Sequence, residues 1–433
     1  MKKQNGYVMD SIYPSYFYKD TQPLWLSTVA RLRGVRGPDL DRPYRYCELG
    51  CGAGFNAILV AALNPGAQVV GVDFNRAHIE LAQALARDMG VANVSFACLD
   101  FQGFCKDNGA PFDIIDCHGV WSWVAPTSQR SILEIVARHL APRGLFCLHY
   151  MCHPGSTPMI PVQQLVRSVA QQAGAGSREA LGAGLAALEH LLAAGHYDDQ
   201  PPLRERLRGM RAAGVDNLAH DLLSDFWSVH HAGDMHWLAT QAGLSFIGAS
   251  DMFYNLDPAI CLPPDMHAMP GIKRSPALVE TLKDMASGRP HRSDVFQKNA
   301  VAPDSRQRRA ALNTLAFMRN PGKTGTDLGC PTVSTPLGSM DLSDPVFAHI
   351  AGIANANATF GFTELCSPEQ PDSAAKRVVE ALTLMLHAEL ILPAQAARSK
   401  ADAAAIAAIN RLLQARQVRL RLDRDAATAW FVP

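Results

Sequence analysis

The sequence of 433 residues has no surplus of charge, because 40 Lys and Arg residues are balanced by 40 Asp and Glu residues. A dedicated nucleic-acid-binding protein usually carries a basic surplus, so the balance argues against that class. The chain also lacks eighteen consecutive apolar residues, and no apolar segment follows its first lysines. These absences argue against a membrane-spanning helix and a signal peptide. We therefore expect a cytoplasmic protein with no membrane span and no nucleic-acid partner.

The chain also lacks the common patterns of redox and metal sites. Its ten cysteines include no C-x-x-C pair, and several, such as Cys47 and Cys117, lie in apolar segments typical of strands. We interpret them as reduced core residues. His230, His231 and His236 do not match the spacing of zinc ligands, so we interpret them as a solvated helix start and expect no metal.

One glycine-rich stretch organises the rest of the chain. It reads Y-R-Y-C-E-L-G-C-G-A-G, from Tyr44 to Gly54, and runs into an apolar helical segment. Gly50, Gly52 and Gly54 allow a tight turn from strand to helix and let a ligand approach the backbone. An apolar run further on ends in Asp73, a place where a carboxylate can bind the hydroxyls of a ribose. The stretch therefore predicts a nucleoside site.

The glycine spacing and a nearby acid indicate which nucleoside it is. NAD enzymes use G-x-G-x-x-G and remain the alternative, whereas this sequence reads G-x-G-x-G. Glu48 precedes Gly50 by two residues, and its carboxylate would repel a pyrophosphate but attract an ammonium group. S-adenosylmethionine carries an ammonium group and no phosphate.

Strands and helices alternate after this stretch. We expect strands ending at Asp73 and at residues 94–99, 112–117 and 145–150, and helices at residues 75–90 and 126–140. Such alternation predicts a parallel α/β sheet with helices on both faces. Residues 154–229 appear purely helical, and a further helix (234–242) and two strands (244–251 and 293–301) would complete the sheet.

Four motifs occur in the order typical of one family. E-L-G-C-G-A-G, V-V-G-V-D-F, C-L-D-F and A-P-R-G-L-F-C-L resemble the motifs of class I S-adenosylmethionine-dependent methyltransferases. The resemblance implies a Rossmann-like sheet and S-adenosylmethionine as cofactor. It also implies cofactor contacts from the glycine loop, the ribose acid and the adenine pair, which here are Glu48, Gly50, Cys51, Gly52, Gly54, Asp73, Phe74, Asp100 and Phe101.

A distinctive segment, D-C-H-G-V-W-S-W-V, leaves the carboxyl end of the fourth strand, at the edge where doubly wound sheets bind ligands. His118, Trp121 and Trp123 are therefore candidates to border the methyl group, and His118 also to contact the cofactor. The alternative is that they only pack or hydrogen-bond the loop. A general base is optional in methyl transfer, and His118 and Tyr150 are the candidates for that role.

The segment H-G-V-W-S-W-V, together with D-N-L-A-H-D-L-L-S-D-F-W and R-S-D-V-F-Q-K, resembles bacterial methyltransferases with a methyltransferase regulatory domain. That group includes lysine N-methyltransferases that modify outer-membrane proteins, so the resemblance implies a protein or peptide lysine as acceptor. Residues 149–156 read H-Y-M-C-H-P-G-S, whereas the group reads S-Y-N-x-x-P-G-W. A small-molecule N- or O-methyltransferase and a non-catalytic cofactor-binding protein remain the alternatives.

The same patterns divide the chain into five parts. An aromatic N-terminal segment either caps the nucleoside site or fills hydrophobic gaps. The helical block offers a place for substrate recognition or for contacts in a homodimer. The expected parts are an N-terminal cap (1–43), the cofactor-binding core (44–153), a helical insertion (154–229), the completion of the core (230–303), and a helical or winged-helix-like C-terminal module (304–433).

Overall fold

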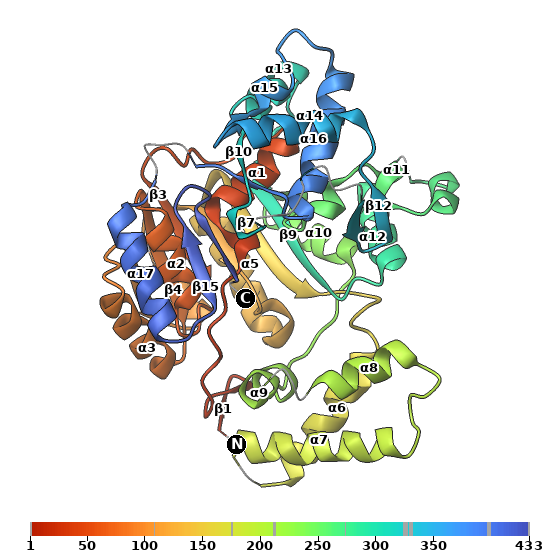
Figure 1. The fold of residues 1–433 in the computed structure, drawn as a ribbon. Helices are drawn as coiled ribbons and strands as arrows, with labels where there is room; N and C mark the ends of the chain where they lie inside the picture. Colours follow the sequence, from red (N-terminus) through yellow and green to blue (C-terminus); the bar gives the residue numbers. More distant parts are fainter. Residues whose placement is uncertain are drawn as a thin grey trace.

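A seven-stranded sheet forms the centre of the computed structural model (Figure 1). Its strand order is β5-β4-β3-β6-β7-β9-β8; the first five strands are parallel, and β9 is antiparallel to both β7 and β8. The structure describes residues 2–107, 109–174, 176–210, 214–272, 274–323, 328, 332–395 and 400–431. The strands are β3 (Tyr44–Leu49), β4 (Ala67–Asp73), β5 (Val94–Cys98), β6 (Phe112–Cys117), β7 (Leu140–Met151), β8 (Leu244–Ala249) and β9 (His291–Lys298).

Helices cover both faces of this sheet, as the alternation of strands and helices predicts. Strand side chains alternate between the two faces of the sheet. On one face, Tyr46 and Ile114 pack with α1 (Pro23–Leu32) and α2 (Phe55–Leu63). On the other face, Cys47 and Ile115 pack with α5 (Pro126–His139) and α10 (Ala232–Gln241). The helix α3 (Arg76–Asp88) begins at Asn75, whose side chain accepts a hydrogen bond from Ala77 N. The Rossmann-like α/β fold is confirmed, including the late antiparallel strand pair.

The segment after β7 is helical, as expected. It comprises α6 (Met159–Gln172), α7 (Ser177–Ala193), α8 (Pro201–Gly209) and α9 (Val215–Leu222), which lie together below the sheet in Figure 1. These helices share a small apolar core, which also takes up Val8 from the N-terminal segment. Within this segment the sequence predicts a helix at residues 203–213, which α8 matches in part, and residues 211–213 lie outside the described part of the chain.

The sequence predicts two long helices near the C-terminus, at residues 305–318 and 374–392, and both end earlier in the structure. The helix α13 (Ser305–Leu312) is followed by β10 (Ala316–Arg319), and α16 (Asp372–His387) likewise ends before β14 (Ile391–Pro393). With β13 (Phe360–Gly361), these strands form a three-stranded sheet in the order β13-β10-β14. Glu389, at φ 56°, interrupts the second helix. A short apolar run is compatible with either a helix end or a strand, and here pairing with neighbouring strands makes these residues extended.

The last part of the chain returns to the central domain instead of staying with the expected C-terminal module. In Figure 1, α17 (Ala403–Ala415) and β15 (Leu420–Asp423) lie beside α2 and α3. Ile406 and Leu413 pack against Leu59, and Arg416 forms an ion pair of 2.7 Å with Asp88. The hairpin of β15 and β16 (Thr428–Phe431) completes this layer.

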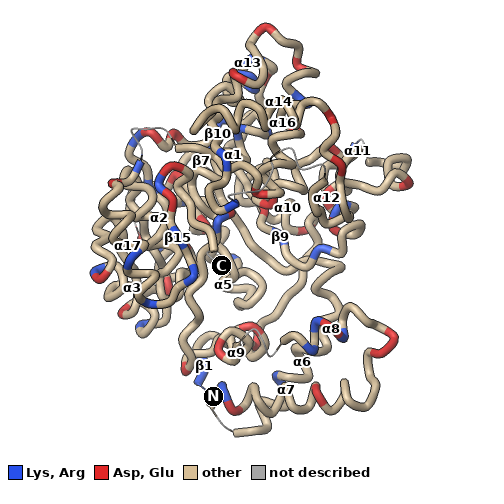
Figure 2. Tube along the Cα trace, in the orientation of Figure 1, with Lys and Arg blue, Asp and Glu red and all other residues tan. Residues whose placement is uncertain are grey.

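Acidic and basic residues are interspersed along the trace in Figure 2, in keeping with their equal numbers. Within the described ranges, no helix is both long and apolar enough to cross a membrane. All free cysteines of these ranges are buried except Cys98, which is partly buried. Cys330 lies outside the described residues.

Candidate active site

The turn after β3 has a shape that only glycine adopts easily. Gly50, Gly52 and Gly54 have φ angles of 77°, 53° and 73°. A Cβ at Gly50 would lie 2.3 Å from Val120 Cγ2, so this position has no space for a side chain. The backbone from Gly50 to Gly52 lines a cavity at the carboxyl edge of the sheet, where a ligand can approach it.

Asp73 ties the end of β4 to this turn. Its Oδ2 accepts a hydrogen bond from Gly52 N at 3.0 Å, and its Oδ1 accepts one from Asn75 N at 2.8 Å. His78 Nδ1 lies 3.6 Å from the same Oδ1. The carboxylate therefore shapes the turn and also lines the cavity beside it. Each oxygen keeps a second acceptor position with which it can bind a hydroxyl.

Glu48 is a buried acid without a cationic partner in the described residues. Burial raises its pKa to about 8, with a further rise from nearby Asp73, although Asn56 Nδ2 donates to its Oε2 at 3.3 Å. Asp116 lies in register with Glu48 on β6, and neither of its carboxyl oxygens has a hydrogen-bond partner in the described structure. Burial raises the pKa of Asp116 well above its usual range, and the charge of Glu48 adds to this.

A ligand with an ammonium group would lower the pKa of Glu48, because an opposite charge favours the ionised carboxylate. Together with an open glycine turn and a ribose-type acid, the donor set fits S-adenosylmethionine. A pyrophosphate would instead be repelled by the negative charge of these carboxylates.

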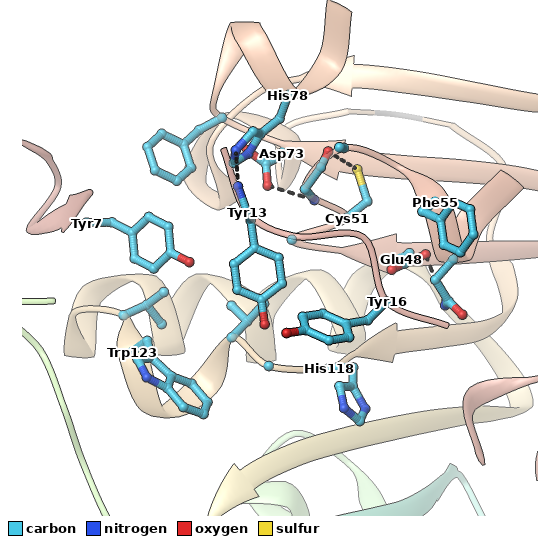
Figure 3. Close-up of a pocket in the computed structure, with 18 of the residues that line it drawn as sticks. Tyr7, Tyr13, Tyr16, Glu48, Cys51, Phe55, Asp73, His78, His118 and Trp123 are labelled. Carbon is cyan, nitrogen blue, oxygen red and sulfur yellow. Dashed lines mark hydrogen bonds and ion pairs between the residues drawn. The ribbon is translucent and has the colours of Figure 1, made fainter. Parts of the chain in front are cut away.

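Glu48, Asp73 and the glycine turn line one cavity at the carboxyl edge of the sheet. Tyrosines of the N-terminal segment cover it, and Figure 3 shows Tyr7, Tyr13 and Tyr16 projecting into the same space that His118 and Trp123 border. Among the described residues that line the cavity, none is Lys or Arg. The cavity is therefore aromatic and acidic, which suits a cationic ligand.

The tyrosine-bearing N-terminal segment is held over the cavity by hydrogen bonds from two directions. Tyr13 N donates to His78 Nε2 at 3.3 Å, and Tyr18 N donates to Asn56 Oδ1 at 3.2 Å. On the other side, Ser11 O lies 3.1 Å from His220 Nε2 of α9. The helical segment thus helps to keep the cavity covered.

His118 lies in a stack of rings next to the cavity. Its ring centroid is 3.8 Å from that of Tyr18 and 4.2 Å from that of His149. Burial lowers the pKa of His118, against the opposing charge of Asp20, and its Nδ1 has no partner within the described structure. Burial also lowers the pKa of His149, whose Nδ1 accepts a hydrogen bond from Gly119 N at 3.3 Å. Both imidazoles are therefore neutral near pH 7.

Most of the predicted site residues meet at this cavity, although the lining does not test their roles. Gly54, Trp121 and Tyr150 are not part of the lining. Gly54 instead begins α2. The residues that do line it are Glu48, Gly50, Cys51, Gly52, Asp73, Phe74, Asp100, Phe101, His118 and Trp123.

Trp121, a candidate to border the methyl group, and Tyr150, a candidate general base, both lie outside the cavity lining. Trp121 is only 1% exposed and packs in the core below the loop. Tyr150 is fully buried, and its hydroxyl donates to Asp294 Oδ2 at 2.7 Å. Strand alternation explains the second case: His149 faces the stack beside the cavity, so its neighbour Tyr150 faces the opposite side of β7.

Sequence reasoning missed three residues that the fold brings to the site. His78 and His149 come from α3 and β7, and Asp221 of α9 accepts a hydrogen bond from Trp123 Nε1 at 2.8 Å. Only His149 gave a signal, because it begins the segment H-Y-M-C-H-P-G-S, which departs from S-Y-N-x-x-P-G-W in similar proteins. The others depend on contacts across the tertiary structure.

Comparison with known proteins agrees with this geometry. Residues 40–184 match the family model described as a methyltransferase domain, and residues 215–298 match that of a predicted methyltransferase regulatory domain. An uncharacterized protein from Synechocystis sp. is 26% identical over 370 residues, which cover 83% of this chain and 71% of the relative. An uncharacterized protein from Rickettsia prowazekii is 37% identical over 143 residues, or 33% of this chain and 26% of the relative.

Solved structures share the fold over most of the chain. The structure of PKMT2 from Rickettsia typhi superposes with a TM-score of 0.70 at 18% identity, covering 97% of this chain and 86% of the other. A second structure of PKMT2, in complex with AdoHcy, gives a TM-score of 0.66 at 18% identity, covering 88% and 77% of the two chains.

Proposed function

We propose that this chain, an S-adenosylmethionine-dependent methyltransferase with a methyltransferase regulatory domain, N-methylates lysine side chains of a protein or peptide. The observation that carries the proposal is the cavity itself, whose described lining combines carboxyl groups and aromatic rings with no Lys or Arg. A carboxylate acceptor would be repelled there, whereas an amine and its methylated cationic product are both favoured.

The cofactor would be held by the residues at the carboxyl edge of β3, β4 and β5. The open turn from Gly50 to Gly52 and the carboxyl of Glu48 would bind its amino-acid part, and Asp73 would accept hydrogen bonds from its ribose. Phe74 and Phe101 would cover the purine, and Asp100 can accept a hydrogen bond from its exocyclic amine. The solved PKMT2 complex with AdoHcy, which shares the fold, supports this assignment.

Bound S-adenosylmethionine supplies a methyl group that its sulfonium already activates. The chain then has to hold a neutral amine in line with that methyl group and keep water away. Tyr13, Tyr16 and Tyr18 cover the cavity and exclude water. His118, kept neutral by burial, is available to accept the proton that the acceptor ammonium must lose before transfer.

The acceptor class is tested by transfer of a labelled methyl group from S-adenosylmethionine into bacterial envelope proteins, cytosolic proteins and a small-molecule extract. Label on protein lysines, located by mass spectrometry, is the expected result. Label only on small molecules would instead indicate metabolite tailoring. Cofactor binding without transfer to any fraction would indicate a non-catalytic partner protein.

A further inference from the structure

Asp221 connects the helical segment to the loop that borders the cavity. Its Oδ1 accepts the hydrogen bond from Trp123 Nε1 at 2.8 Å, and Trp123 lines the cavity. Ser224 Oγ donates to Trp123 O at 2.9 Å, and Ser228 N donates to Ser122 O at 2.9 Å. The helical segment therefore holds this loop in place and brings a carboxylate to its side.

The same carboxylate lies close to the tyrosines that cover the cavity. The negative charge of Asp221 contributes to the raised pKa values of Tyr7 and Tyr13, after burial as the larger cause. The neighbouring His220 ring lies 5.3 Å from each of the two phenol rings, centroid to centroid. Asp221 thus lies beside Trp123, and the adjacent residue His220 lies against both tyrosines.

Asp221 also lacks a cationic partner at contact distance. It is partly buried, yet it forms no ion pair with any of the described residues. Burial raises its pKa, whereas the indoles of Trp123 and Trp227 and the charge of Arg206 lower it. The Arg206 guanidinium donates to Gly155 O at 3.3 Å. A partly buried carboxylate that has hydrogen bonds but no ion pair is stabilised by the arrival of a cation.

We propose that Asp221 is the recognition carboxylate for the methyl acceptor, binding the ammonium of the incoming lysine side chain at the rim of the cavity, between Trp123 and the phenols of Tyr7 and Tyr13. The inference rests on the proposed function and makes Asp221 a specificity-determining residue. The carboxylate supplies the opposite charge, and the rings shield the pair from water. Asp221 takes part in docking only.

The test measures binding of n-butylammonium, which mimics a lysine side chain, and of the neutral 1-butanol, both by nuclear magnetic resonance. The protein is first saturated with S-adenosylhomocysteine. We expect the natural protein to prefer the ammonium by about tenfold, the range of a charged hydrogen bond. Asp221→Asn should remove the preference and leave the affinity for S-adenosylhomocysteine unchanged, because an amide oxygen still accepts from Trp123. Asp199→Asn, an exposed acid of the same segment, is the matched control.

A second variant keeps the test informative if Asp221→Asn folds poorly. Arg206→Gln removes the competing positive charge and should tighten n-butylammonium binding. Equal binding of the two probes by the natural protein, or a full preference in Asp221→Asn, would overturn the inference. A failure of the proposed function can be told apart from a failure of this inference. It would appear in the labelling experiment as label on acceptors other than lysine, independently of how the two probes bind.

Discussion

The ring of His118 lies on the ring of His149, with centroids 4.2 Å apart and planes inclined by 20°. Each ring would repel a positive charge on the other, so burial lowers the pKa of His149 and the neighbouring His118 lowers it further. The pair therefore presents a neutral imidazole next to the cavity. A neutral imidazole can take a proton from an amine, which an imidazolium cannot.

Replacing His118 with Ala should lower turnover strongly and change cofactor affinity little. General acid–base groups typically contribute about 10²- to 10⁴-fold. Tyr150→Phe is a suitable control, because Tyr150 lies outside the cavity lining; it should lower stability by about 1–3 kcal/mol through loss of the Asp294 contact, with normal kinetics. Steady-state kinetics and calorimetry measure both variants. The reverse pattern for His118→Ala would make this residue a cofactor ligand.

Asp73→Ala should weaken cofactor binding by about 1.5–3 kcal/mol, as expected for loss of charge-assisted hydrogen bonds. Asp73→Asn keeps a carbonyl oxygen for one of the bonds from Gly52 N and Asn75 N, so its loss should be smaller. Isothermal titration calorimetry with S-adenosylhomocysteine gives both values. Unchanged affinity in Asp73→Ala would contradict the ribose assignment.

Cofactor binding should release a proton from Glu48 near neutral pH. In the free protein burial raises the pKa of Glu48 to about 8, so most of this carboxyl is protonated at pH 7. A bound ammonium group lowers that pKa, and binding therefore strengthens as pH rises from 6 toward 8. Calorimetry in buffers of different ionisation enthalpy counts the protons. Glu48→Gln should abolish the release from this group, and equal release in both proteins would refute its placement.

Gly50→Ala should disrupt the turn more than a glycine substitution at a similar backbone angle elsewhere. Gly50 has φ 77° and a Cβ there meets Val120 Cγ2 at 2.3 Å, whereas Gly90 has φ 67° and nothing within 4 Å of an added Cβ. Gly90→Ala should cost only the backbone strain, about 1–2 kcal/mol. Gly50→Ala should cost more and remove cofactor binding. Equal thermal stability of the two variants would contradict the described turn.

The central sheet and the glycine turn could be predicted because they depend on local signals. Apolar runs of strand length, Asn75 as a helix cap and Gly90 at the helix end all lie within a few residues of the elements they define. The order of the motifs then indicated the cofactor. Local sequence patterns were therefore sufficient to predict the strands and helices of the central sheet.

The remaining features depend on which segments meet in space. The strands β10 and β14 are too short to differ from helix ends until they pair. The sequence offers Tyr150 as a candidate general base, but strand alternation turns its side chain to Asp294. Asp221 reaches Trp123 across 98 positions of sequence. No local pattern indicates such a contact.

The most direct test of lysine methylation compares a protein fraction that accepts the labelled methyl group before and after acetylation of its amines. Acetylation removes the charge and the nucleophile of lysine while leaving carboxylates and hydroxyl acceptors largely intact. The account predicts that the label is lost on acetylated proteins and that mass spectrometry of the untreated fraction finds methyl groups on lysine Nζ. Full labelling of the acetylated fraction would contradict it and would assign the methyl group to another acceptor.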